Sequence, residues 1–183
     1  MNKLYLRNSR AYAILSDEDV QWARQWDWSL SSNGYAVRYV EADGRYKTIY
    51  LHREVMQRKL GKPIPPGLQV DHVGRQRLLN TREALRLATR SQNQANKGIQ
   101  VNNSSQFKGI NYNQGKFEAR IRYRGKRLHL GRFDDPERAA LYYDCASRLL
   151  YLAFSGTNFP EVPTPSDVET AVRDRLVRYG IDI

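Results

Sequence analysis

Short stretches in which hydrophobic and polar residues alternate recur along the chain, and this pattern predicts β-strands separated by polar turns. In residues 1–50 it predicts short strands around one helix, whose N-terminal capping signal is Ser16-Asp17-Glu18-Asp19. Residues 35–40 and 47–52 are expected to form a hairpin about a turn at Asp43-Gly44. The tryptophans here, at positions 22, 26 and 28, are either a base-stacking platform or core, and their spacing favours core.

The middle of the chain predicts two short strands and a helix. The proline- and glycine-rich segment 61–67 is a rigid connection into a strand at residues 68–72, which ends on Asp71 and His72. After a loop at 73–84, alternation predicts a second strand at 85–89, and the capping box from Thr89 to Gln92 predicts a short helix. A rival interpretation starts one longer helix at Asn80, because the residues from Asn80 to Glu83 also form a capping signal.

The last third of the chain predicts a hairpin followed by two helices. In residues 116–124 the apolar side chains fall on one strand face, and the other face carries Lys116, Glu118, Arg120, Arg122 and Arg124. Residues 127–130 repeat the alternation after a turn at Gly125-Lys126. Asp135-Pro136-Glu137 begins a helix that is expected to pack across the sheet, and a second capped helix from Ser166 covers either this core or a partner subunit.

The formal net charge is +11, and the positive excess lies in residues 51–159. Basic charge of this size favours a polyanionic partner, because contacts to phosphates release condensed counterions. A membrane partner is not expected, since the sequence lacks a long apolar run. The single cysteine, Cys145, excludes an internal disulfide and is expected to be packed. The first residues do not have the form of a signal peptide, so a cytoplasmic location is expected, in the host cell if the chain is phage-encoded.

The three histidines are His52, His72 and His129, and His72 has the strongest case for chemistry. Asp71 beside it and Asn93 in the following helix would supply oxygen ligands for a hard cation such as Mg²⁺. A polar loop of structural use is the alternative for an Asp-His pair.

Five stretches of the chain together resemble phage-type HNH endonucleases of the homing-endonuclease-like kind: Leu51-His52-Arg53-Glu54, residues 67–72, Leu79-Asn80, residues 85–93 and Asn96. The resemblance implies a ββα-metal site that cuts DNA with Mg²⁺ or Mn²⁺. In it His72 is the general base, Asp71 and Asn93 hold the metal ion, and all three are catalytic residues.

Two positions depart from the family pattern. Ala84 stands where the family carries the asparagine that braces the histidine, so Asn80 or Gln92 would have to substitute for it. The residues after His72 also lack the usual acidic position. A DNA-binding protein or regulator with a decayed HNH site is therefore the alternative.

A second resemblance, to AP2 DNA-binding domains, rests on Lys108-Gly109-Ile110, residues 116–122 and 128–133, Tyr143-Asp144 and Asn158-Phe159. It implies a three-stranded antiparallel sheet, packed on one helix, that enters the major groove of DNA. The residues implied to face the groove are Asn111, Asn113, Arg120, Arg122, Arg127 and His129. Phosphate contacts are expected from Lys108, Arg124 and Lys126.

Together these features predict an α+β fold: an N-terminal leader at 1–50, the HNH core at 51–98, a linker at 99–106, the AP2-like domain at 107–160 and a helical tail at 161–183. The expected function is nicking of double-stranded DNA by a chain that acts as a monomer. RNA binding through stacked aromatic residues is weakened, because the alternation assigns most of those residues to the core face.

Overall fold

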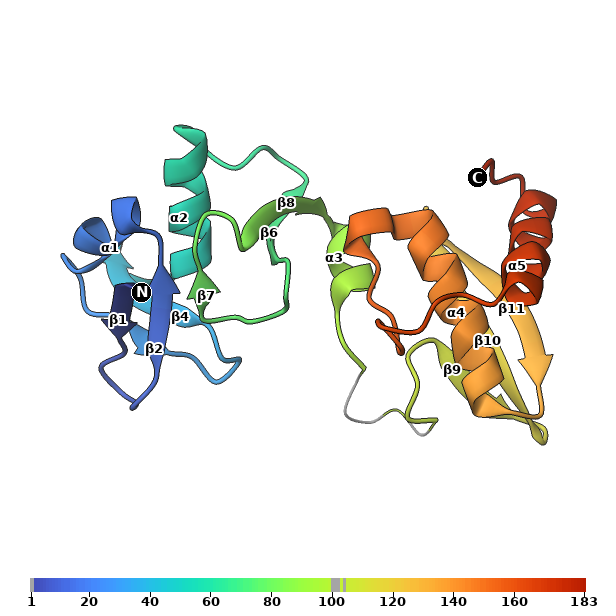
Figure 1. The fold of residues 1–183 in the computed structure, drawn as a ribbon. Helices are drawn as coiled ribbons and strands as arrows, with labels where there is room; N and C mark the ends of the chain where they lie inside the picture. The colour runs from blue at the N-terminus through green and yellow to red at the C-terminus, as the bar shows by residue number, and fades with distance from the viewer. Residues whose placement is uncertain (1, 100–102, 104) are drawn as a thin grey trace. The chain divides into compact units, whose positions relative to one another are not determined.

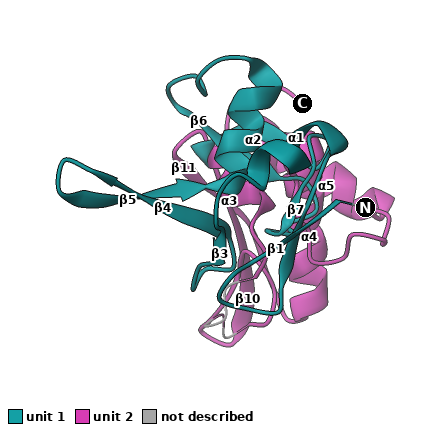
Figure 2. Ribbon diagram, turned by 90° about the vertical axis from the view of Figure 1, so that its left-hand side faces the viewer, with its two compact units in different colours: residues 1–90 teal, residues 91–183 magenta. Residues whose placement is uncertain are grey.

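The computed structural model describes residues 2–99, 103 and 105–183, and it contains two compact units, Met1–Arg90 and Ser91–Ile183 (Figures 1 and 2). Both units combine helices with small sheets, so the predicted α+β class is confirmed. Part of the expected linker at 99–106 lies outside the described residues. The positions of the units relative to one another are not determined, and each is described by itself.

The first unit contains three small sheets and two helices. The sheets have the strand orders β1-β2-β7, β3-β4-β5 and β6-β8, and all pairs are antiparallel except β2 with β7, which is parallel. The elements are β1 (Asn2–Tyr5), β2 (Tyr12–Leu15), α1 (Asp17–Ala23), β3 (Ser29–Leu30), β4 (Ala36–Ala42), β5 (Arg45–Tyr50), α2 (Leu51–Leu60), β6 (Leu68–His72), β7 (Leu79–Asn80) and β8 (Leu85–Thr89).

One hydrophobic core joins the predicted leader to the segment that follows it. Leu4 and Trp28 from the leader share this core with Val55 of α2 and Leu85 of β8. Trp28 is buried and its Nε1 donates a hydrogen bond to the carbonyl oxygen of Ala23, so the core interpretation of the tryptophans is confirmed for it. Because apolar surface removed from water stabilises the fold in proportion to its area, the leader stabilises the segment that carries His72.

Two expectations for the first unit are wrong. The strand expected at residues 47–52 ends at Tyr50, and Leu51 begins α2 instead, with Leu51, Val55 and Met56 forming its buried stripe. This spacing is helical, but the many charged residues around it obscured the pattern. The rival long helix from Asn80 is also wrong, because Asn80 ends β7 and the chain then turns into β8.

The second unit is a three-stranded antiparallel sheet packed against helices. Its elements are α3 (Arg90–Asn96), which begins at the unit boundary, β9 (Ile110–Asn113), β10 (Lys116–Tyr123), β11 (Lys126–Phe133), α4 (Pro136–Tyr151), the short 3₁₀ helix η1 (Leu152–Phe154) and α5 (Ser166–Arg178). The sheet order is β11-β10-β9, and α4 packs against all three strands. The expected turn at Gly125-Lys126 lies one residue earlier, at Arg124-Gly125, and Lys126 begins β11.

Of the two helix-capping signals predicted in this unit, the structure confirms the one at Asp135 and not the one at Ser166. Asp135 caps α4, because its carboxylate accepts hydrogen bonds from the backbone N–H groups of Glu137 and Arg138. Ser166 is the first residue of α5 and makes no capping bond. Val168, Val172 and Leu176 of α5 are buried in the unit's own core, which decides between the two uses left open for the tail.

Helix α4 packs closely against the loop before β9. A side chain at Gly109 would place its Cβ 2.0 Å from Cδ2 of Tyr143, and its φ of 77° also favours glycine. The buried carboxylate of Asp144 accepts hydrogen bonds from the backbone N–H and the Nδ2 of Asn158, whose Oδ1 accepts one from the N–H of Lys108. Several residues that carry the second resemblance are therefore structural.

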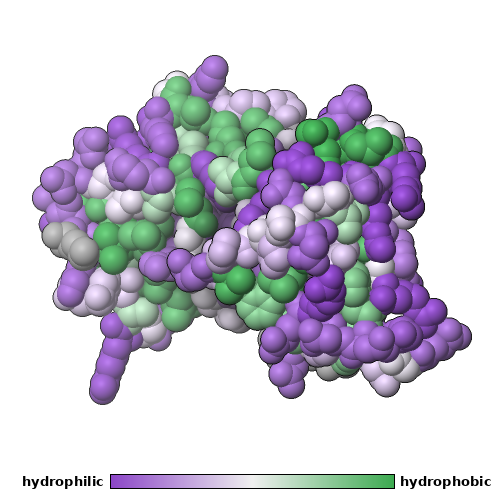
Figure 3. All heavy atoms as spheres, turned by 45° about the vertical axis from the view of Figure 1, so that its right-hand side comes forward, coloured by the Kyte–Doolittle hydropathy of each residue, from purple (hydrophilic) through white to green (hydrophobic). Residues whose placement is uncertain are grey.

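Hydrophilic side chains form much of the face drawn in Figure 3, and hydrophobic ones gather in smaller areas between them. Cys145 is buried, as expected, and burial raises the pKa of its thiol to about 11. Among the described residues, none of the helices combines the length and the apolar character that crossing a membrane requires.

Candidate functional site

Asp71 and His72 end strand β6, and both side chains are buried. Strand β8 pairs with β6 so that Arg86 stands opposite Asp71 and Leu85 opposite His72. The Nε of Arg86 donates a hydrogen bond of 2.9 Å to Oδ2 of Asp71. The carboxylate predicted to hold a cation is therefore already paired with a guanidinium group from the neighbouring strand.

Asn80 of β7 holds the ring of His72. The Nε2 of His72 lies 3.3 Å from Oδ1 of Asn80, and the Nδ2 of Asn80 donates to the carbonyl oxygen of Arg77 at 3.4 Å. An amide oxygen only accepts hydrogen bonds, so this contact is a hydrogen bond in the tautomer that carries its proton on Nε2 and its lone pair on Nδ1. Asn80, one of the two residues expected to substitute for Ala84, thus makes a hydrogen bond with the ring of His72.

Ala84 contributes to this region through its backbone. Its carbonyl oxygen accepts a hydrogen bond of 2.9 Å from the N–H of Val73, the residue after His72. Gln92, the other residue considered as a substitute brace, is in the second unit. The hydrogen bond with Asn80 is made within the first unit itself.

Two aromatic rings lie beside the buried ring of His72, and burial lowers its basicity. The ring centroid of His72 lies 5.3 Å from that of His52 and 6.0 Å from that of Tyr35. Burial lowers the pKa of His72, although Asn80 and Asp71 oppose that shift. Burial, together with the charge of His72, also lowers the pKa of His52 to about 3. Both rings are therefore neutral at neutral pH, the form in which an imidazole accepts a proton.

The loop after β7 is held by helix α1. The Oγ of Ser16 accepts a hydrogen bond of 2.9 Å from the N–H of Arg82, so Ser16 binds this loop and does not cap α1. The buried Asp19 carboxylate binds the guanidinium groups of Arg82 at 2.7 Å and Arg58 at 2.8 Å. Burial by itself would raise the pKa of Asp19, but the two arginines outweigh burial and lower it. These contacts fix the segment that follows Asn80.

Asn93, the second predicted metal ligand, is in α3 and belongs to the second unit. Asp71 and His72 therefore lie together in the first unit, and the position of Asn93 relative to them is not determined. Among the residues that the structure describes, no three His, Cys, Asp or Glu side chains are grouped as a metal site would require. The donors available, a carboxylate and an amide oxygen, fit a hard cation in kind, and the cation would have to share Asp71 with Arg86.

The outer face of the second unit's sheet brings together most of the predicted DNA-contacting residues. Arg122 stands directly opposite Arg127, and Arg120 directly opposite His129. A groove of about 280 Å³ on this sheet is lined by Arg120, Arg122, Arg127, Asn111, Gly109 and Ile121. Asn113 is exposed on the edge strand β9, and Arg124 and Lys126 are exposed at the β10–β11 turn.

Two side chains do not follow the expected pattern. Glu118, expected on the solvent face, is buried, and it lies within 2.9 Å of Nε2 of His129 and also pairs with Arg120. The alternation of β10 is intact, and Glu118 is buried because the side chains of Arg120 and His129 pair with it. The extra residue at the strand irregularity is Leu130 of β11, which brings His129 opposite Arg120. Lys108 lies apart from the sheet face, since its Nζ donates to the carbonyl oxygens of Ala95 and Lys97 at the C-terminal end of α3.

Comparison with known proteins agrees with the assignment of the middle segment. Residues 49–95 match the family model of the HNH endonucleases, and this range contains Asp71, His72, Asn80 and Asn93. An uncharacterized HNH endonuclease of Acanthamoeba polyphaga mimivirus is 28% identical over 153 residues, which cover 83% of this chain and 77% of that protein.

A second similarity is shorter. Dehydration-responsive element-binding protein 2D of Arabidopsis thaliana is 46% identical over 68 residues, which cover 36% of this chain and 33% of that protein. The chain thus spans about a third of the length of this plant relative. No solved structure shows a significant match. The similarity to HNH endonucleases is supported by two comparisons, and the one to a plant element-binding protein by a single partial match.

Proposed function

We propose that the chain is a divalent-metal-dependent DNA endonuclease in which His72 is the general base. The observation that carries this proposal is the buried pair of Asp71 and His72, with the ring held by Asn80, inside the segment that matches the HNH endonuclease model. A positioned neutral imidazole can act as the general base in hydrolysis of a phosphodiester, and the neighbouring carboxylate is a ligand type that a divalent cation prefers.

The proposed reaction uses the lone pair of His72. Its Nδ1 accepts a proton from a water molecule, the water oxygen bonds to phosphorus, and the bond from phosphorus to the 3′ oxygen breaks. Asn80 keeps the ring oriented, and the low basicity of the buried ring keeps it ready to accept the proton at neutral pH. A bound Mg²⁺ or Mn²⁺, held by Asp71 and Asn93, would neutralise the negative charge that develops on the phosphate and the leaving oxygen.

The outer face of the second sheet is the proposed contact to duplex DNA. Arg120, Arg122, Arg127 and His129 present donors on one face, and arginine can bind two acceptors of a guanine at once. The pairing of Glu118 with Arg120 and His129 leaves Arg122 and Arg127 as the stronger candidates for base contacts. With one general base in the chain, we propose that a monomer nicks one strand.

Incubation with supercoiled plasmid tests this proposal. Nicked circles are expected with Mg²⁺ or Mn²⁺ and not with a chelator. A DNA-binding regulator without catalysis is the second candidate, and the hydrogen bond from Arg86 to Asp71 favours it, because it occupies an oxygen that the metal ion would need. Binding of duplex DNA without nicking in either metal would replace the first proposal with the second.

Replacement of Asn80 with alanine is expected to lower the nicking rate about 10- to 100-fold, the usual effect of removing a group that orients a metal-site residue. Ala84→Asn is the matched control. It is expected to leave the rate unchanged, because the Oδ1 of Asn80 already accepts the hydrogen bond from Nε2 of His72. Single-turnover nicking at saturating DNA measures both, and a faster Ala84→Asn enzyme would contradict the bracing role of Asn80.

Arg122→Ala is expected to change the sequence preference of DNA binding, whereas Lys126→Ala is expected to change only the overall affinity. Arg122 lies within the sheet face, so its loss is expected to relax sequence preference at one position and cost about 1–3 kcal/mol at the preferred site. Lys126 begins β11 beside the turn, so its loss is expected to weaken binding to all DNA sequences alike. It is also expected to reduce the slope of log K against log salt by about 1. Selection from a random duplex pool by the full chain measures this, and equal loss at every site for both variants would contradict the assignment of Arg122.

A further inference from the structure

The outward face of the β1–β2 hairpin carries two tyrosines that the core does not use. Tyr5 is 70% exposed and Tyr12 36% exposed, and they stand opposite each other in the strand register with ring centroids 5.9 Å apart. The Nζ of Lys3, from the same face, lies 4.3 Å from the ring centroid of Tyr12. The alternate residues Leu4 and Ala13 are buried, so the hairpin presents a basic, aromatic surface to solvent.

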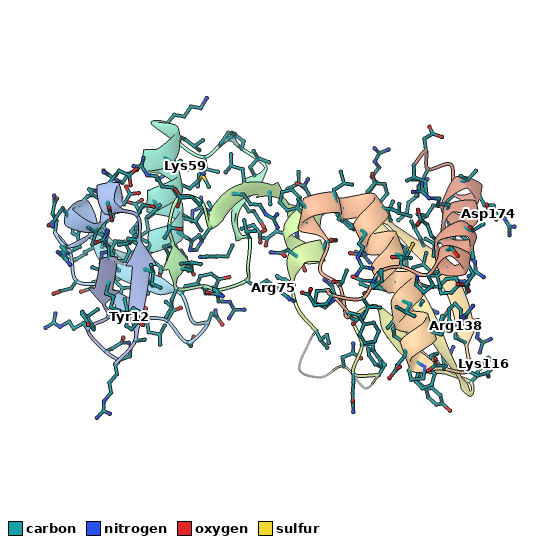
Figure 4. All side chains as sticks on the ribbon, in the orientation of Figure 1. Tyr12, Lys59, Arg75, Lys116, Arg138 and Asp174 are labelled. Atoms are coloured by element: carbon teal, nitrogen blue, oxygen red, sulfur yellow. The ribbon has the colours of Figure 1, made fainter. Side chains whose placement is uncertain are left out.

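A groove of about 380 Å³ borders this surface. Tyr12 and Ile14 of β2 line one part of it, and the loop residues Arg75, Gln76 and Arg77 line another. Figure 4 labels Tyr12 on β2 and Arg75 in the loop before β7. Among the described residues that line the groove none is acidic, and two are arginines. The groove thus combines an aromatic ring with positive charge.

Arg75 occupies a strained backbone position in this loop. Its φ is 59°, in the left-handed region that glycine adopts at no steric cost, and its N–H donates to the carbonyl oxygen of His72 at 3.0 Å. A bulky residue in this region costs roughly 1–2 kcal/mol. Strained residues of this kind concentrate at functional sites, and here the strain accompanies a guanidinium group that lines the groove.

The groove is connected to the proposed catalytic centre through β7. Strand β2 pairs in parallel with β7, with Ile14 opposite Leu79. Successive residues of a strand point to opposite faces, and accordingly Leu79 lines the groove while Asn80 holds His72. The loop that lines the groove also begins directly after His72. A ligand in the groove therefore lies one strand away from the His72 ring.

We propose that this groove binds single-stranded DNA, with an unpaired base stacked on Tyr12 and backbone phosphates bound by Arg75 and Lys3. In a duplex the bases are stacked on each other and do not reach an aromatic side chain, so the ring selects unpaired bases. The arginines and the absence of acidic lining residues favour a polyanion over a protein segment. The proposal rests on the proposed function only in taking DNA as the ligand, and it does not require cleavage.

The test measures binding of a labelled oligothymidylate of about twelve nucleotides, within the usual range of such sites, by the full chain in a chelator. Tyr12→Leu is expected to weaken binding about 10-fold, because base stacking is lost, whereas Tyr12→Phe retains the ring and the affinity. Arg75→Gly is expected to reduce the slope of log K against log salt by about 0.7, without lowering the melting temperature, since glycine accepts the positive φ.

Matched controls come from the β4–β5 hairpin of the same unit. Tyr46 is 77% exposed and Arg45 is exposed beside it, so Tyr46→Leu and Arg45→Ala remove an equivalent ring and charge outside the groove. Neither control is expected to change oligothymidylate binding, and none of the groove variants is expected to change duplex binding.

The outcomes separate the groove from the nuclease. Equal weakening by Tyr12→Leu and Tyr46→Leu would overturn the groove assignment, and so would tighter binding of an oligouridylate of the same length. Binding of duplex but not of single strands would overturn the groove proposal alone. Binding of neither form by the wild-type chain would overturn the proposed function as well.

Discussion

Replacement of His72 with alanine is expected to lower metal-dependent nicking by about two to four powers of ten, the usual contribution of a positioned general base. The affinity for duplex DNA is expected to stay unchanged, because the ring is buried beside Asn80 and the proposed duplex contacts are in the second unit. Single-turnover nicking and equilibrium binding in a chelator measure the two quantities separately. Added imidazole is expected to restore part of the rate, since a small base can enter the space left by the ring.

His52 is the control for this assignment, because its ring lies 5.3 Å from that of His72 and it is the only other histidine of the first unit. His52→Gln keeps a side chain of similar size, and it is expected to retain nicking within about one power of ten of the wild type. If His52→Gln removed nicking and His72→Ala did not, the two histidines would have to exchange roles. If imidazole failed to rescue His72→Ala, the loss would reflect altered packing and not a missing base.

Local patterns in the sequence were sufficient for the elements that carry the site. Alternation placed Asp71 and His72 at the end of a strand, and β6 ends at His72. The turn signal at Asp43-Gly44 predicted the β4–β5 hairpin, because the conformation of a two-residue loop sets how the two flanking strands pair. Such signals lie within a few residues of the feature they predict, although the end of β5 was overridden by the start of α2 at Leu51.

The contacts that hold His72 depend on pairings between distant segments. Asn80 reaches His72 because β7 joins the first sheet beside β2, a parallel pairing between residues more than sixty positions apart. No periodicity within β7, which has two residues, predicts that contact. The resemblance suggested Asn80 or Gln92 as the substitute for Ala84, and the structure shows a hydrogen bond between Asn80 and His72.

The sequence predicted which face of the second sheet carries charged side chains, but it did not predict which of them pair with each other. The alternation assigned Arg120, Arg122 and Glu118 to one solvent-exposed face, and Glu118 is instead buried on that face by its pairing with Arg120 and His129. Alternation assigns a side chain to a face of a strand, but it does not show which side chains of that face pair with one another.

Asp19→Ala is expected to lower the free energy of unfolding of the first unit by about 3 kcal/mol, because a buried carboxylate that neutralises two guanidinium groups is lost. The three tryptophans of the chain are in this unit, so urea denaturation followed by tryptophan fluorescence reports on it alone. Glu18→Ala is the matched control. Glu18 is 62% exposed and lies 3.9 Å from the same Arg82, so its loss is expected to cost less than about 1 kcal/mol.

The pH dependence distinguishes the charge of Asp19 from its packing. The arginines lower the pKa of Asp19 in the folded protein below its ordinary value of 3.8, so the carboxylate stabilises the fold fully above pH 3.8 and loses this effect as the pH falls through the lower folded value. Asp19→Asn keeps the shape and removes the charge. The difference in unfolding free energy between wild type and Asp19→Asn is therefore expected to be constant near neutral pH and to shrink below pH 3.8. A difference that stayed constant into strong acid would show that Asp19 acts through packing, and that the loop carrying Arg82 is not held by the ion pair.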